Sequence, residues 1–156
     1  MYVRNFLFKA KFHAMIISQL SVFLENRSGR LTEVLEILGM EKISITALAV
    51  ADTSDFGILR ILVSDPVKAR DLLKNQLFTV SITEVISVIV PNEARHYAAL
   101  LKILSDLDIS VEYTYAFSRG SESIIILRCS DNEKAIKALK DKNIRLLGEN
   151  ELNGGH

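Results

Sequence analysis

The sequence repeats itself at an offset of 66 residues, and the match runs without a gap from Leu20 to Val80. Matched pairs include Ser21 with Ser87, Asn26 with Asn92, Ile43 with Ile109, Asp65 with Asp131, and Leu73 with Leu139. A period of this length indicates paired domains rather than a solenoid. The chain is therefore expected to fold as two copies of one small unit.

The size of the chain suits this interpretation, because 156 residues with 49% hydrophobic content fill two cores of about 65 to 70 residues each. Cores this small are marginal alone, so we expect the units to pack tightly and the chain to form a homodimer. The expected parts are an N-terminal extension over residues 1–14, a first domain over 15–83, a second domain over 84–152 and a tail over 153–156.

Charge and cysteine content restrict the partners of the protein. Nineteen basic and nineteen acidic side chains cancel, which argues against binding to nucleic acid or to an anionic membrane surface. Charged residues interrupt every apolar stretch that approaches the length of a membrane span. The single cysteine, Cys129, has no partner for an internal disulfide and suits a reducing compartment. We therefore expect a cytoplasmic protein.

The first fourteen residues have no counterpart in the second copy and are basic and aromatic. We interpret them as an extension upstream of a start at Met15, or as an edge strand; an arm that binds a membrane or a partner is the less favoured alternative. The segment lacks the continuous apolar run of a signal peptide. The tail over residues 153–156 is expected to be a loose end.

Within each copy, hydrophobic residues alternate between a period of two and a period of about 3.6. The first copy predicts strands at 20–24, 43–51, 57–63 and 78–83, with helices at 31–39 and from Pro66 onward. The second predicts strands at 85–90, 109–117, 123–129 and 144–147, with helices containing Leu100 and Leu139. This βαββαβ order predicts an α+β protein of two ferredoxin-like units, each a four-stranded antiparallel sheet with both helices on one face. No linker separates the copies between residues 78 and 90, so we expect a fixed pair.

The stretch LENRSGRL, residues 24–31, carries the chemistry, because it lies where the first strand gives way to the first helix. The side-chain amide of Asn26 both donates and accepts hydrogen bonds, and Gly29 permits a bend and a close backbone approach. Unpaired amides at the start of a helix suit a carboxylate. The alternative is purely structural: Asn26 and Ser28 cap the helix, and Gly29 turns the chain.

This stretch resembles the loop motif of ACT domains, which has Asn, two residues, Gly, one residue and Leu. ADTSDFGILR at 51–60 and EYTYAF at 112–117 resemble the small stand-alone tandem ACT proteins of bacteria, and the resemblance covers residues 17–152. It implies a regulatory module that binds a free amino acid at this loop, at an interface between two ACT units whose sheets pair side by side.

Site roles follow from the resemblance. Asn26 is expected to bond the amino or carboxylate group of the ligand, while the backbone near Gly29 takes the carboxylate. The candidate ligand-binding residues are Asn26, Arg27, Ser28, Gly29, Arg30, Leu31, Asp52, Asp55, Phe56, Tyr113 and Tyr115. Asp52 and Asp55 are candidates for an ammonium group, with turn formation as the alternative. Tyr113, Tyr115 and Phe117 share one strand face, either as a pocket wall or as core beneath the helices.

The second copy departs from the motif, because it keeps Asn92 but has Arg95 in place of the glycine and Tyr97 in place of the leucine. We expect one binding loop and one supporting domain. A possible second site comprises Asn92, Arg95 and His96; Arg95 is either exposed to solvent or reaches toward a carboxylate that the other unit holds.

Two rival functions were weighed against a sensor. RNA-recognition domains use the same strand order and stack bases on sheet aromatics, but the balanced charge argues against this class. A small ferredoxin-like enzyme acting on a phosphate or an amino-acid derivative lacks support, since the sequence has no metal-ligand spacing, nucleophile elbow or glycine-rich phosphate loop. We expect a non-enzymatic sensor without cofactor or metal that dimerises through sheet edges and acts on a separate enzyme or transporter.

Overall fold

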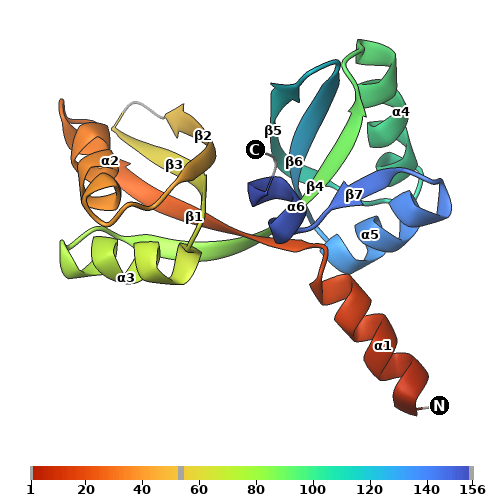
Figure 1. Ribbon diagram of the computed structural model, residues 1–156. Helices are drawn as coiled ribbons and strands as arrows, with labels where there is room; N and C mark the ends of the chain where they lie inside the picture. Colours follow the sequence, from red (N-terminus) through yellow and green to blue (C-terminus); the bar gives the residue numbers. More distant parts are fainter. Residues whose placement is uncertain (1, 53–54, 155–156) are drawn as a thin grey trace. The chain divides into compact units, whose positions relative to one another are not determined.

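The computed structural model describes residues 2–52 and 55–154 (Figure 1). The chain divides into two compact units: the first-copy unit, Ser18–Thr83, and the second-copy unit, Met1–Ile17 together with Glu84–His156. Both units have the βαββαβ order with an antiparallel sheet. The predicted fold class, two ferredoxin-like units, is confirmed.

The first-copy unit pairs its strands in the order β2-β3-β1-β4. Its elements are β1 (Ile16–Glu25), α2 (Arg30–Met40), β2 (Ile45–Asp52), β3 (Phe56–Val63), α3 (Pro66–Asn75) and the start of β4 (Val80–Pro91). Alternate residues of the strands, such as Val22 and Ile61, pack with Val34 of α2 and Leu73 of α3 in one buried cluster. Both helices therefore cover the same face of the sheet, because alternate strand residues share a face.

The second-copy unit pairs its strands in the order β5-β6-β4-β7. Its remaining elements are α4 (Ala94–Ser105), β5 (Val111–Arg119), β6 (Glu122–Cys129), α5 (Asn132–Asp141) and β7 (Arg145–Leu147). Val88, Leu104, Leu127 and Leu139 belong to the cluster between helices and sheet. The strand β4 is continuous from Val80 to Pro91, so the residues on both sides of the boundary between the units are extended.

The four repeat helices end in the same way. At the end of α3, the amide of Phe78 donates to the carbonyl of Leu73 (3.0 Å) and that of Leu77 donates to Lys74 (3.0 Å). This is the Schellman arrangement, with its usual contact between two apolar side chains. The left-handed position is filled at every one of these ends by a residue other than glycine: Lys42, Leu77, Asp108 and Asn143. The repeat is therefore preserved in backbone conformation as well as in sequence.

The N-terminal segment is a helix, α1 (Tyr2–His13), so the edge-strand interpretation of residues 1–14 is wrong. Phe12 is buried in the core of the second-copy unit, where Met15 and Ile16 pack against the same cluster. A short helix near the C-terminus, α6 (Glu149–Asn153), buries Leu152. No helix within the described residues is long and apolar enough to cross a membrane.

Candidate functional site

The loop between β1 and α2 is held against the start of β3. The amide of Asn26 donates to the carbonyl of Asp55 (3.2 Å), and the amide of Arg27 donates to the carbonyl of Glu25 (2.7 Å). The amide of Arg30 closes the turn on Arg27 at 3.3 Å. Of the predicted site residues, the structure thus brings Asn26 and Asp55 together through their backbones.

Gly29 is the residue whose backbone conformation defines this loop. It precedes α2 with φ +88°, in the left-handed region that favours glycine. A Cβ placed here would meet no described atom within 4 Å, so glycine is required by the backbone angle and not by lack of space. The N-cap position of α2 is Gly29 itself, which makes no side-chain cap hydrogen bond, so neither Asn26 nor Ser28 is the N-cap residue. The first amides of a helix are the groups that can bind an anion, and in α2 the helix begins at Arg30.

The two arginines of the loop differ in environment. The side chain of Arg27 is 60% exposed, with ion pairs to Glu25 at 4.0 Å and to Glu33 at 3.7 Å. That of Arg30 is only 15% exposed: its guanidinium carbon lies 4.1 Å from the ring centroid of Phe78, and Nη1 donates to Glu33. Arg27 is accessible to a ligand, whereas Arg30 is fixed to its own domain.

The equivalent loop of the second copy has a different helix start. At the 66-residue offset the counterpart of Arg30 is His96, yet α4 already begins at Ala94. Arg95 is therefore helical and needs no left-handed conformation, and its exposed side chain pairs with Glu93 (2.8 Å). His96 is half-buried. The sequence showed the exchange of glycine for arginine but not the two-residue extension of the helix that accompanies it.

The two asparagines of the loops also differ. The amide of Asn92 donates to the carbonyl of Ser121 (3.2 Å), just as that of Asn26 donates to Asp55. The side-chain oxygen of Asn92, however, accepts a hydrogen bond from the buried hydroxyl of Ser123 (2.9 Å). The counterpart of Ser123 in the first copy is Gly57, which has no hydroxyl. Asn92 thus has a structural partner that the first copy does not offer to Asn26.

The remaining predicted residues lie on the strands. Asp55 is exposed, and the side chain of Asp52 lies outside those that the structure describes. Phe56 stacks on Phe23 of the neighbouring strand, with ring centroids 4.7 Å apart and planes at 28°. Both rings belong to the first-copy unit, beside the loop rather than within it.

Tyr113, Tyr115 and Phe117 lie on the sheet face opposite the helices. They pair with Arg128, Ile126 and Ile124, whereas the alternate residues of β6 form the core with α4 and α5. The interpretation of these aromatics as core beneath the helices is therefore wrong. They belong to the second-copy unit, and the loop over residues 26–31 belongs to the first.

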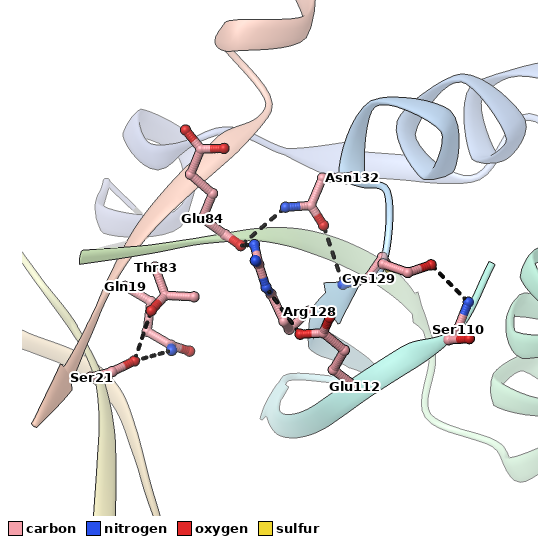
Figure 2. Close-up of polar contacts among 10 residues, drawn as sticks. Gln19, Ser21, Thr83, Glu84, Ser110, Glu112, Arg128, Cys129 and Asn132 are labelled. Carbon is pink, nitrogen blue, oxygen red and sulfur yellow. Dashed lines mark hydrogen bonds and ion pairs between the residues drawn. The ribbon is translucent and has the colours of Figure 1, made fainter. Parts of the chain in front are cut away.

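Two polar clusters were not foreseen from the sequence (Figure 2). In the second-copy unit the carbonyl of Glu84 accepts from Nη1 of Arg128 (2.7 Å) and from Nδ2 of Asn132 (3.0 Å), while Oδ1 of Asn132 accepts from the amide of Cys129 (3.2 Å). The counterparts of Arg128 and Asn132 at the 66-residue offset are Leu62 and Pro66. These departures from the repeat were the signal that could have revealed this cluster.

In the first-copy unit, the buried Gln19 donates to the hydroxyl of Ser21 (3.2 Å), which lies 3.0 Å from that of Thr83 (Figure 2). The chain passes between the units at Ile17–Ser18 and again at Thr83–Glu84, and Thr83 and Glu84 are each hydrogen-bonded within their own unit. Hydrogen bonds that involve side chains therefore hold the chain on both sides of the Thr83–Glu84 boundary.

The described residues include one buried thiol, that of Cys129. Burial raises the pKa of the Cys129 thiol to about 11, so this thiol is protonated at neutral pH. Within the described part of the chain, no three or more His, Cys, Asp and Glu side chains gather as metal ligands would.

Comparisons with known proteins agree with this architecture. A family model described as an ACT domain pair matches residues 15–154, which confirms the predicted resemblance. Protein BT0572 from Bacteroides thetaiotaomicron is 45% identical, with a TM-score of 0.85, over 89% of this chain and 96% of that chain. The comparison with curated proteins gave no match.

More distant solved structures share the fold. The regulatory subunit of aspartate kinase from Thermus thermophilus, in a ligand-free form, has a TM-score of 0.61 at 12% identity, over 80% of this chain and 91% of that chain. The subunit from Thermus flavus has a TM-score of 0.55 at 13% identity, over 81% and 94%. At such low identity these two structures support the fold alone.

Proposed function

Because the chain belongs to the ACT domain pair family, we propose that it is a non-enzymatic regulatory protein that binds a free amino acid at residues 26–31 of the first copy. The observation that carries the proposal is the conformation of Gly29, which has a φ of +88° at the N-cap position of α2. Arg95, its counterpart, lies inside a helix. This difference favours one binding loop per chain.

The proposed contacts follow from the chemistry of the loop. The first-turn amides of α2 and the positive end of the helix dipole receive the carboxylate of the amino acid. The exposed guanidinium of Arg27 adds a charge-assisted donor, and Asn26 bonds the amino or carboxylate group. Asp55, exposed and next to Asn26 through the backbone hydrogen bond, is the carboxylate that we assign to the ammonium group.

Regulation is proposed to work by linkage. A ligand held between the loop and a neighbouring ACT unit stabilises one arrangement, and a partner protein recognises that arrangement. We propose a cytoplasmic homodimer that pairs through sheet edges and whose target is a separate enzyme or transporter.

A thermal-shift screen of the twenty amino acids at 10 mM tests this function. A ligand with Kd near 1 mM adds about 1.4 kcal/mol to the stability of the folded state at that concentration, which raises Tm by several degrees for a domain of this size. We expect at least one amino acid to raise Tm. No shift with any of the twenty would contradict the proposal.

A further inference from the structure

The side chain of Glu33 bridges the two arginines at the start of α2. Its Oε2 accepts from Nη1 of Arg30, and its Oε1 lies 3.7 Å from Nη2 of Arg27. Glu33 belongs to the first turn of the helix, where a negative charge is favoured by the helix dipole. A carboxylate of the protein itself therefore already occupies the electrostatic position that suits an anionic ligand.

Arg30 is held firmly on its other side. Its guanidinium packs over Phe78, which is buried in the core of the first-copy unit. Its Nε is buried without a hydrogen-bond partner among the described residues. A guanidinium in this environment needs a counter-charge, and Glu33 is the carboxylate that the described residues give it. Glu33 is consequently fixed by Arg30 beside the loop.

Arg27 is held much less firmly. Its side chain is exposed, and both of its ion pairs are long, at 3.7 and 4.0 Å. Exposed pairs of this kind contribute little free energy, so a ligand carboxylate can replace Glu33 at Arg27 at small cost. The pair of Glu33 with Arg30 remains in place when this happens.

The second copy lacks every part of this arrangement. At the 66-residue offset the counterparts of Arg30, Glu33 and Phe78 are His96, Ala99 and Ile144. The second-copy unit therefore has the same fold without this charge bridge. The bridge occurs only in the copy that also has the left-handed glycine, Gly29. Because the charge bridge is found only beside the candidate binding loop, we connect it with that loop and not with the fold in general.

We infer that Glu33 is a built-in competitor for the carboxylate of the ligand, so that it weakens binding and sets the concentration at which the sensor responds. The inference rests on the proposed function of residues 26–31. In the free protein Glu33 neutralises Arg27 and the positive end of α2. Bound amino acid takes over Arg27 but remains subject to repulsion from Glu33, because both carboxylates face the same helix start. Removing the negative charge of Glu33 is therefore expected to tighten binding.

Calorimetric titration of Glu33→Gln tests this inference at low salt, with the amino acid that raises the Tm of the unmodified protein most. Glutamine keeps an acceptor for Arg30 and removes the charge, and circular dichroism of Glu33→Gln checks that the variant is folded before it is titrated. We expect Kd to fall by about three- to fivefold, at the upper end of the range of surface electrostatic effects. The gain should shrink in 0.5 M NaCl, since salt screens exposed charges.

Glu36→Gln is the matched control, because Glu36 is exposed on the same helix and makes no ion pair with the described residues. Its Kd should stay within twofold of the unmodified value. Equal gains in both variants would mean a general charge effect and would overturn the inference. Weaker or unchanged binding in Glu33→Gln would also overturn it, since Glu33 would then support the loop instead of competing.

Failure of the inference and failure of the proposed function give different results. If the unmodified protein binds an amino acid and Glu33→Gln binds it no more tightly, the inference alone is wrong. If the unmodified protein responds to none of the twenty, the same screen is run on Glu33→Gln and Glu33→Ala. A response of either variant supports the inference that Glu33 is a competitor, because removal of Glu33 has then made binding detectable. If neither variant responds, both the inference and the proposed function are overturned.

Discussion

Gly29 and Arg95 occupy equivalent places in the repeat but have different backbone conformations. Gly29 is left-handed ahead of α2, and Arg95 lies in the first turn of α4. A β-branched residue at φ +88° costs at least 1–2 kcal/mol, roughly, and the loop is expected to rearrange to avoid that strain. The chemical identity of one residue is therefore tied to the backbone conformation that its loop adopts.

We predict that Gly29→Val abolishes the response to the amino acid while leaving the far-ultraviolet circular dichroism unchanged. Arg95→Gly is expected to leave Kd within about twofold, because Arg95 is exposed and pairs only weakly with Glu93. Calorimetric titration of both variants with the amino acid measures the two values of Kd. Equal loss of affinity in the two would contradict the assignment of a single binding loop.

Cys129 gives a second prediction at this scale. With its pKa raised to about 11 by burial, about one thiol in a thousand is ionised at pH 8. Alkylation by iodoacetamide should therefore be slow in the folded protein and fast in urea. Above pH 9 the unfolded chain loses the thiol proton before the folded one, so the free energy of unfolding should fall as pH rises toward 11. Rapid labelling of the folded protein at pH 8 would show that the thiol is accessible.

At the scale of the elements, each repeat helix closes on a residue in the left-handed conformation. Leu77 is the least suited of these, because a bulky side chain is disfavoured at its φ of +65° and 91% of its surface is exposed. Asn143, its counterpart, belongs to a residue type that tolerates this region.

Leu77→Gly should therefore raise the free energy of unfolding by about 0.5–1 kcal/mol, after the greater flexibility of glycine in the unfolded chain is subtracted. Asn143→Gly is the matched comparison and should gain less. Urea denaturation measures both. A destabilised Leu77→Gly would indicate that the exposed leucine makes contacts that stabilise the fold.

The hydrogen bonds around Asn132 yield another prediction for the elements. Asn132→Ala leaves the buried amide of Cys129 without its side-chain acceptor and removes one donor from the carbonyl of Glu84. The expected loss is about 1–3 kcal/mol. Ser130→Ala, at the same end of β6, removes only an exposed acceptor for Ser110 and should cost less than about 1 kcal/mol. Equal losses would show that Asn132 has no special role.

The order of strands and helices was predictable, because hydrophobic periodicity reports which side of an element is buried. The sequence did not predict helix α1, since Phe12 is buried against residues of the second copy that are far away in the sequence. The face of Tyr113 was undetermined for a similar reason: alternation shows that residues share a face but not which face the helices cover. The earlier start of α4 follows from backbone hydrogen bonds that residue identities do not reveal.

In the molecule as a whole, the two copies have the same architecture but different polar and charged side chains. The two units share strand order, helix ends and the backbone hydrogen bond that fixes each loop asparagine. They differ where chemistry is expected: the first copy has Gly29 and the Glu33 charge bridge, and the second has Asn132 and Arg128 at the unit boundary. The loop motif itself was recognisable from sequence, whereas the charge bridge required the packing of Arg30 on Phe78.

We propose that an amino acid binds at only one of the two equivalent loops, residues 26–31. Titration of ¹⁵N-labelled protein with the amino acid that raises Tm most, followed by amide chemical shifts, tests it directly. We expect saturable shifts concentrated at residues 26–33, with the amides over 92–99 little changed. Shifts concentrated at 92–99, or equal shifts in both loops, would contradict it.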